Sequence, residues 1–238
     1  MRARLIETVE NFEPKFLWYP YIPFESTSVF QGQAEFCKTA IIGRIIAELS
    51  NGIYPPRLIR GNIKDRTQLT EWELYVINWD NCHKKTPPMN IPFKRPLGEP
   101  IKTVYISRNT RNTDYIKNIY QMFGGRDGFL KVNDGLTGLS RKLIGDAKFV
   151  VIDSIFPSFC DIKVLESETG AAFLFLNDFN ISQSVFMIDV DEGIHYIESV
   201  KNYYAPDYGR IGILMDDLGR PEFLNYERLK KELDRKQI

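Results

Sequence analysis

A phosphate-binding loop is the clearest chemical signal in the sequence. Such loops have the form G-x-x-x-x-G-K-[ST] between a strand and a helix, where glycines let backbone N–H groups reach phosphate oxygens, the lysine contacts the terminal phosphates and the hydroxyl binds magnesium. The segment 32–39 reads GQAEFCKT, with Gly32, Lys38 and Thr39 at the matching positions. These three residues are the candidate nucleotide-binding set.

Two residues inside this loop oppose the same chemistry. Cys37 stands where the second glycine belongs, and a side chain there restricts the backbone and crowds an approaching phosphate. Glu35 adds a carboxylate, which at about 4–6 Å repels a phosphate by several kcal/mol in a partly dry site, and which could pair with Lys38 instead. The alternative is that Lys38 and Thr39 merely open a helix. The loop alone does not decide between these interpretations.

The periodicity around the loop predicts alternating strands and helices. A short buried strand is expected at 28–31 before the loop, and a helix at 38–50 follows it, with isoleucines on one helical stripe. Strands without polar side chains favour a parallel sheet covered by helices on both faces. We expect further strands at 103–107, 129–132, 149–152 and 171–176, and helices at 114–123 and 138–144.

The remaining segments differ from this alternation. Hairpins are expected at 185–200 and 211–224, followed by a charged helix at 226–236. Between about 53 and 100, prolines and basic residues are frequent, which predicts an irregular insertion at the edge of one domain spanning 1–238. Contact of this insertion with nucleic acid is possible but weakly supported, because such binding needs clustered positive charge.

The composition excludes several classes of protein. Lys plus Arg and Asp plus Glu both number 31, so the zero net charge argues against a dedicated DNA-binding domain. The cysteines, Cys37, Cys82 and Cys160, are scattered and form no C-x-x-C pair, which argues against a zinc site or a disulfide framework. The apolar runs are too short for a membrane span and no secretory signal is present, so we expect a cytoplasmic protein without membrane contact.

Five segments along the chain carry a family resemblance. They are 16–23 (FLWYPYIP) with 29–32 (VFQG), 104–107 (VYIS), 149–157 (FVVIDSIFP), 169–180 and 200–206. Together they resemble the RepA-like, AAA-type branch of the RecA/DnaB P-loop ATPases of bacterial plasmids, phages and mobile elements. The resemblance implies a RecA-like fold, a mostly parallel sheet flanked by helices with antiparallel C-terminal hairpins. It also places Asp153 near the magnesium water and Lys201 toward a neighbouring subunit's nucleotide, although both could be simple polar strand ends.

The departures from the family pattern concern its catalytic parts. The segment 107–110 (SRNT) follows the second core strand, where the family has the acidic residue that activates water. Asp178 stands where a histidine is usual, the stretch 157–169 is too short for the family's long helix, and the channel loop before Val185 is nearly absent. Phosphoryl transfer depends on positioning and electrostatics, so these losses predict a degenerate active site, that of a pseudo-ATPase.

Three functional hypotheses remain open at this stage. The first is a non-catalytic scaffold or regulatory subunit of DNA replication or mobile-element machinery, acting with a protein partner or further copies of itself. The second is a slow ATPase that acts with DNA, and the third is a regulator that binds a nucleotide without hydrolysis. ATP and magnesium are possible ligands, and Thr39 and Asp153 would hold the metal only if a magnesium nucleotide binds.

Overall fold

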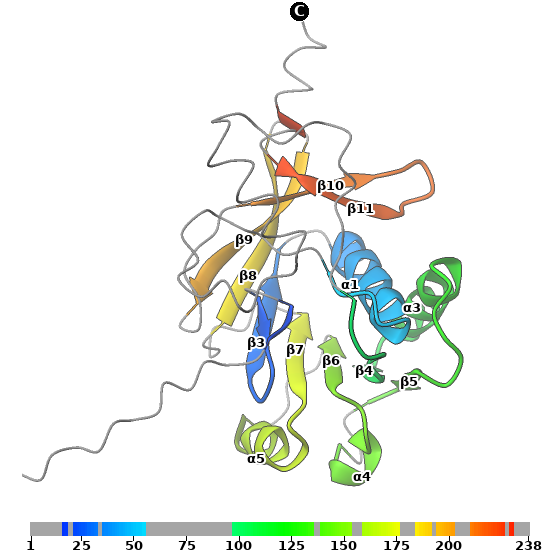
Figure 1. Cartoon of the computed structure of the whole chain (residues 1–238), viewed down its shortest axis with the longest axis vertical. Coiled ribbons are helices and arrows are strands. Elements are labelled where there is room, and N and C mark those ends of the chain that lie inside the picture. The colour runs from blue at the N-terminus through cyan, green and yellow to red at the C-terminus, as the bar shows by residue number, and fades with distance from the viewer. Residues whose placement is uncertain are drawn as a thin grey trace, which may run out of the picture.

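The computed structural model describes residues 16–18, 21–32, 35–55, 97–135, 139–153, 159–176, 184–191, 194–202, 210–226 and 229–230, of which the side chains of 35–37, 159–160 and 225 are excluded. Its centre is a nine-stranded sheet in the order β11-β10-β9-β8-β3-β7-β6-β4-β5 (Figure 1). The strands are β3 (Thr27–Gln31), β4 (Thr103–Ser107), β5 (Leu130–Asn133), β6 (Phe149–Asp153), β7 (Ala172–Leu176), β8 (Ser184–Asp191), β9 (Ile194–Asn202), β10 (Ile211–Met215) and β11 (Pro221–Asn225).

Six neighbouring strands, from β8 to β5, are parallel. The carboxyl ends of parallel strands lie at one edge of a sheet, which is where ligands bind in open α/β sheets. This edge therefore carries Gly32 after β3, Ser107 at the end of β4 and Asp153 at the end of β6. The predicted class, a mostly parallel sheet flanked by helices and completed by antiparallel C-terminal strands, is confirmed.

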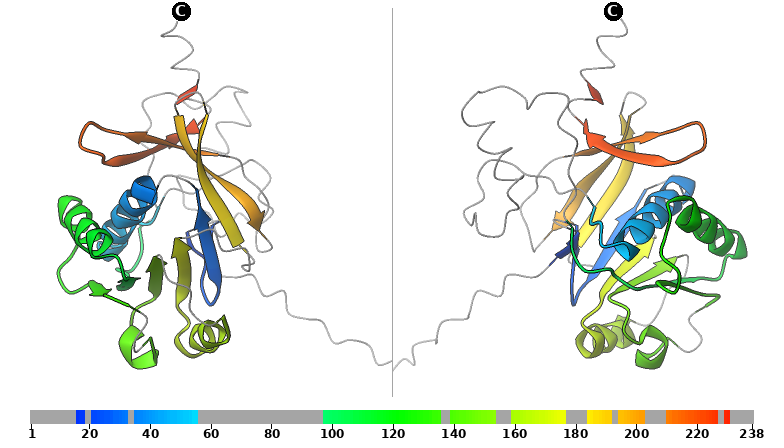
Figure 2. Two further views of the ribbon diagram at one scale, coloured as in Figure 1. Left: turned by 180° about the vertical axis from the view of Figure 1, so that it is seen from behind. Right: turned by 45° about the vertical axis from the view of Figure 1, so that its right-hand side comes forward.

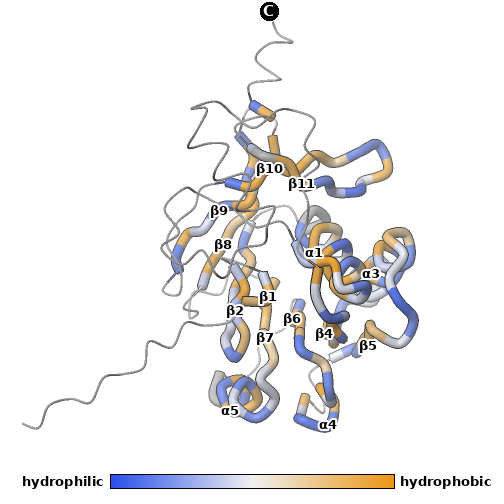
Figure 3. Tube along the Cα trace, viewed as in Figure 1, coloured by the Kyte–Doolittle hydropathy of each residue, from blue (hydrophilic) through white to orange (hydrophobic). Residues whose placement is uncertain are grey.

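Helices cover both faces of the parallel sheet. α1 (Glu35–Ser50) and α3 (Thr110–Met122) pack together on one face, and α4 (Arg141–Ile144) and α5 (Phe159–Thr169) lie on the other (Figures 1 and 2). Successive strand residues point to opposite faces, so Val151 packs toward α1 while Val150 and Ile152 pack toward α5. Most described side chains of α1 are buried, in accord with the apolar stretch along it in Figure 3.

The aromatic segment at the start of the described chain belongs to the core. β1 (Phe16–Trp18) and β2 (Ile22–Pro23) form a small antiparallel pair. The rings of Trp18 and Tyr21 are fully buried, and both contact Phe186 of β8 edge-on or tilted, at centroid distances of 5.9 and 5.2 Å. Such ring pairs add to the stabilisation that burial provides. The segment is thus anchored against the sheet.

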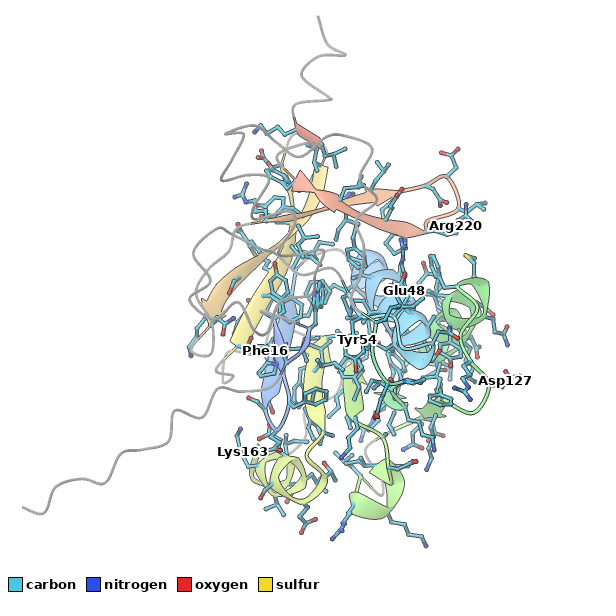
Figure 4. The ribbon with its side chains drawn as sticks, viewed as in Figure 1. Phe16, Glu48, Tyr54, Asp127, Lys163 and Arg220 are labelled. Atoms are coloured by element: carbon cyan, nitrogen blue, oxygen red, sulfur yellow. The ribbon has the colours of Figure 1, made fainter. Side chains whose placement is uncertain are left out.

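The β10–β11 hairpin is joined to α1 by one arginine. Arg44 of α1 donates a hydrogen bond to the carbonyl oxygen of Pro221 in β11 and pairs with Glu48 at 2.7 Å. Its guanidinium also lies 5.0 Å from the ring centroid of Phe123 and 5.6 Å from that of Phe223. Figure 4 shows Glu48 on α1 beneath the hairpin whose turn carries Arg220.

Several predicted boundaries shift, and one helix was not predicted. α1 begins three residues before the expected Lys38, and α3 begins at Thr110 instead of Asp114. The stretch considered too short for a long helix contains the 11-residue α5. The insertion between 56 and 96 and most of the predicted terminal helix lie outside the described residues. In the described part of the chain, no helix combines the length and apolar character needed to cross a bilayer.

Candidate functional site

The amino-terminal end of α1 forms the first part of the candidate site. β3 ends at Gln31 and α1 begins at Glu35, so the helix starts directly above the carboxyl end of the strand. The backbone N–H groups in the first turn of a helix lack acceptors within the helix, and the helix dipole adds partial positive charge there. These two properties make such a helix end suited to an anion. Loop residues 33–34 and the side chains of Glu35 and Cys37 lie outside the described residues.

Gly32 is fixed by the backbone of the neighbouring strand. Its φ of +131° lies in a region that residues with side chains rarely adopt. A Cβ at this position would lie 2.5 Å from the carbonyl oxygen and 2.6 Å from Cγ2 of Ile188 in β8. The close approach of β8 is therefore enough to explain a glycine here, whether or not a phosphate binds.

Lys38 is buried in the first turns of α1. Only 5% of its surface is exposed. Among the described residues, no hydrogen bond or ion pair of its ammonium group is found. A buried ammonium group without a counter-charge is unfavourable, because it loses its hydration and gains nothing in return. The described part of the site thus supplies no counter-charge to this ammonium group next to a helix amino terminus.

Asp153 lies on the same face and at the same edge of the sheet. Asp153 of β6 pairs with Leu176 of β7. The preceding residue of β7, Phe175, pairs with Val29 of β3, so Asp153 lies one residue further toward the carboxyl edge than Val29. Two strand spacings, about 10 Å, separate β3 from β6. Asp153 alternates with Val151, which packs toward α1, so its side chain projects from the α1 face. The structure therefore brings this aspartate to the edge that α1 overlies.

The carboxylate of Asp153 is held by two neutral donors. Its Oδ2 accepts a hydrogen bond from the Tyr105 hydroxyl at 2.5 Å and another from Asn112 Nδ2 at 2.7 Å. Only 4% of the aspartate is exposed. Tyr105 belongs to β4 and Asn112 to the first turn of α3, so this carboxylate connects three elements. Burial, and then the adjacent charge of Asp153, raise the pKa of Tyr105 far above its usual range.

The position expected for a water-activating acid has a structural role instead. Asn109 caps α3, because its side chain accepts a hydrogen bond from the backbone N–H of Arg111 at 3.0 Å. The backbone N–H of Asn109 in turn donates to Ser107 Oγ at 3.2 Å. No carboxylate is present in the segment 107–110. The second departure, at Asp178, lies outside the described residues.

Comparisons with known proteins add little to this geometry. No protein-family model matches the chain. No curated protein matches its sequence either. Among solved structures, the chain is similar to one described as the crystal structure of the RadB recombinase, with a TM-score of 0.44 and 9% sequence identity, over 86% of this chain and 93% of that one. A similarity at this level carries no information about ligand, activity or partner.

Lys201 lies away from this site within its own chain. It is in β9 and pairs with Val185 of β8, which itself pairs with Val29 of β3. Lys201 is therefore two strands away from β3. Along the strands it is level with Val29, which lies three residues before Gly32.

The residues expected to hold magnesium, Thr39 and Asp153, lie at the start of α1 and at the end of β6. Magnesium requires near-octahedral oxygen coordination and keeps several bound water molecules. A nearby carboxylate accepts hydrogen bonds from these waters through its oxygen lone pairs. Oδ2 of Asp153 already accepts from both Tyr105 and Asn112. In the described ranges, no group of three or more His, Cys, Asp or Glu side chains could hold a metal. Thr39 is buried at the start of α1.

Tyr105 and Asn112 are the site residues that sequence reasoning missed. A tyrosine in an apolar strand is typical of a core residue, and an asparagine in a helix is typical of a surface residue. The alternation of β4 does place Tyr105 on the same face as Ser107, and the register pairs Ser107 with Asp153. The missing information was that β4 and β6 are neighbours, which the local sequence does not reveal.

Proposed function

We propose that this chain is a non-catalytic RecA-like domain that binds a phosphate-bearing ligand, such as a nucleoside di- or triphosphate, at the amino terminus of α1. The observation that carries the proposal is the buried ammonium group of Lys38 beside that helix end, to which the described residues supply no counter-charge. A bound phosphate would supply the missing counter-charge, and first-turn N–H groups would donate hydrogen bonds to it.

The absence of hydrolysis follows from the groups around the same edge. The position after β4 offers the capping Asn109 in place of an acid, and Asp153 is engaged by Tyr105 and Asn112. Because the described residues at this edge offer no free acid to orient water, the rate is expected to fall by orders of magnitude. Binding without turnover is typical of a regulatory or scaffold subunit. We propose that this subunit acts in the cytoplasm, with a protein partner or with further copies of itself.

The test combines thermal denaturation with phosphate release. ATP, ADP and GTP are added to the full chain and to the Lys38→Met variant, which keeps the length of the side chain and removes its charge. The wild type should gain several degrees of melting temperature with at least one nucleotide and release no phosphate above background. The variant should gain nothing. Nucleotide-dependent release of phosphate would instead support the slow ATPase.

The link to DNA replication or mobile elements is the narrower part of the proposal. It rests on the sequence resemblance to the RepA-like ATPases, and the neutral net charge speaks for a protein partner over direct DNA binding. Addition of single- and double-stranded DNA to the same assay examines the alternative. Turnover that DNA stimulates would assign the chain to the DNA-dependent ATPases.

A further inference from the structure

We infer that the outer side of β5 binds an extended segment of a partner protein, in which apolar residues alternate with acidic ones. β5 is the last strand of the nine-stranded sheet, and in the described part of the chain no strand pairs with its outer side (Figure 1). Such an edge strand accepts a further strand from another chain through main-chain hydrogen bonds. β7, β6 and β4 separate β5 from β3, so this surface and the phosphate site can be tested independently.

The parallel pairing with β4 decides which backbone groups of β5 point outward. The N–H of Thr103 in β4 donates to the carbonyl oxygen of Phe129 at 2.8 Å, and Thr103 pairs in register with Leu130. Because the backbone groups of successive strand residues point to opposite sides, Phe129 and Lys131 bond toward β4, whereas Leu130 and Val132 direct their N–H and C=O groups outward. Among the described residues, no hydrogen bond to these outward groups is found. An added strand would replace water as their partner.

A groove on the α3 side of β5 would hold the apolar side chains of the added strand. It has a volume of about 320 Å³ and lies between α3 and β5. Leu130 and Val132 are half-buried, pack against the core on this face and form the apolar lining with Tyr120. Side chains at alternate positions of a strand point to the same face, so apolar residues there would enter the groove. The polar lining comes from Lys117, Gln121 and Asp127, the last of which is labelled in Figure 4.

The opposite face of the sheet is basic next to the same strand. Lys131 alternates with the two groove residues and so projects from this face, where its Nζ donates to a backbone carbonyl oxygen of α4 at 3.1 Å. The helix adds the exposed side chains of Arg141 and Lys142. The nearby acid Asp146 already pairs with Lys102 at 2.5 Å. Acidic residues at the alternate positions of an added strand would therefore meet positive charge, which is a favourable cross-strand pairing.

Lys131 also argues against a second copy of the chain as the occupant. Two β5 strands can pair about a two-fold axis with Leu130 of each copy opposite Val132 of the other. This register uses both outward-facing residues, and it places the two Lys131 side chains directly opposite each other. Like charges in that position are unfavourable, and a lysine on an edge strand is a common protection against such pairing. An acidic segment of a different protein replaces this repulsion by attraction.

Fluorescence anisotropy of the full chain with two short labelled peptides tests this assignment. One peptide alternates valine with glutamate and the other alternates valine with lysine, so they share the apolar side and differ only in charge. The glutamate peptide should bind about tenfold or more tightly than the lysine peptide. Lys131→Glu, at an exposed position, should remove or reverse this preference. Lys148→Glu is the matched control and should keep it, because Lys148 is likewise exposed and donates to a backbone carbonyl, that of Thr169, but precedes β6.

Amide hydrogen exchange, followed by NMR, identifies the surface that the peptide occupies. The glutamate peptide should slow exchange at the outward-facing amides of Leu130 and Val132 and leave β11, at the opposite edge of the sheet, unchanged. Binding without slower exchange at these two amides would overturn the inference, as would equal affinity for the two peptides or no binding of either. Dimers in sedimentation velocity whose formation slows exchange at the same amides would show that a second copy is the occupant, which also overturns it.

Discussion

The hydroxyl of Tyr105 and the carboxylate of Asp153 lie on neighbouring parallel strands and are joined by a hydrogen bond of 2.5 Å. Both residues are buried, so water does not compete for the bond. Asn112 of α3 completes the contact at 2.7 Å. One carboxylate thereby connects β4, β6 and the start of α3, at the sheet edge where the candidate ligand site lies.

Tyr105→Phe should lower the free energy of unfolding by about 1–3 kcal/mol, because it removes a donor from a buried carboxylate and changes the volume little. Urea denaturation of the two proteins measures the difference. Tyr54→Phe, which removes an exposed hydroxyl, should stay within about 0.5 kcal/mol of the wild type. Equal effects of the two substitutions would show that the Tyr105 contact contributes no net stability.

Alkaline pH should destabilise the protein through Tyr105. The pKa of this phenol is raised in the folded state, so above pH ~10 the unfolded chain releases a proton that the native state retains. Its contribution to stability is fully present below that pH and is lost as pH rises above it, by up to about 1.4 kcal/mol per pH unit. Denaturation at several alkaline pH values should give a shallower decline for Tyr105→Phe, without abolishing it, because Tyr120, Tyr196 and Tyr226 also have raised pKa values.

Lys38→Met should stabilise the ligand-free protein. The substitution replaces a buried ammonium group, unpaired within the described residues, by an apolar side chain of similar length, and a gain of about 1 kcal/mol is expected. Melting temperatures without any added anion measure it. Lys117→Met is a suitable control, since Lys117 is exposed and lies 3.9 Å from Asp114. A destabilised Lys38→Met protein would show that the lysine contributes to the fold and would weaken the case for an anion site.

Gly32→Ala should cost more stability than Gly128→Ala. Both glycines have positive φ, of 131° and 78°, so each substitution carries a backbone cost of about 1–2 kcal/mol. At Gly128 a new Cβ meets nothing within 4 Å, whereas at Gly32 it meets the Ile188 carbonyl oxygen at 2.5 Å. The clash should add about 1–3 kcal/mol. Chemical denaturation of both variants isolates the contribution of the close approach between β3 and β8.

Tyr226→Phe should raise the pKa of Asp191 toward its usual value. The Tyr226 hydroxyl donates to Asp191 Oδ2 at 2.5 Å, and this bond is the main reason that the pKa of Asp191 is lowered. Because the pKa of Asp191 is lowered in the folded state, its carboxylate stabilises the folded protein above the unfolded-state pKa. This contribution is lost as pH falls through the lower pKa of the folded state. Carbon-detected NMR titration of the carboxyl group reads the shift. Tyr196→Phe is the control. The Tyr196 ring lies 4.1 Å from the guanidinium of Arg210, and the substitution keeps that ring, so the titration of Asp191 should stay nearly unchanged.

Local sequence predicts the helices and strands in which apolar side chains recur with a regular spacing or in an unbroken run. The isoleucine stripe gives α1, and the apolar runs give β4, β6 and β7, all within a few residues of their observed bounds. The start of α1 was missed because its first residues carry no repeat. α5 was missed because, of its described side chains, only Ile162 and Leu165 are fully apolar and buried.

The polar contacts of the sheet could not be predicted in the same way. Glu166 of α5 looks like a surface residue, yet it is buried, accepts a hydrogen bond from Thr27 of β3 and pairs with Lys163 at 2.6 Å. The bonds from Tyr105 and Asn112 to Asp153 likewise depend on which elements become neighbours. Strand order is set by the whole chain, so residues far apart in sequence meet without any local signal.

The position of β3 between β7 and β8 has a consequence for how the protein folds. Thr27 pairs with Phe173 and Ser28 with Ser184, so the first strand of the large sheet has no hydrogen-bonded neighbour until most of the chain has been synthesised. Closing such long loops is entropically slow, and non-local strand pairing delays folding. During translation the apolar strand that leads to the phosphate loop must therefore wait, exposed, for its partners. Exposed strand edges of this kind are prone to aggregation until the paired strands have been made.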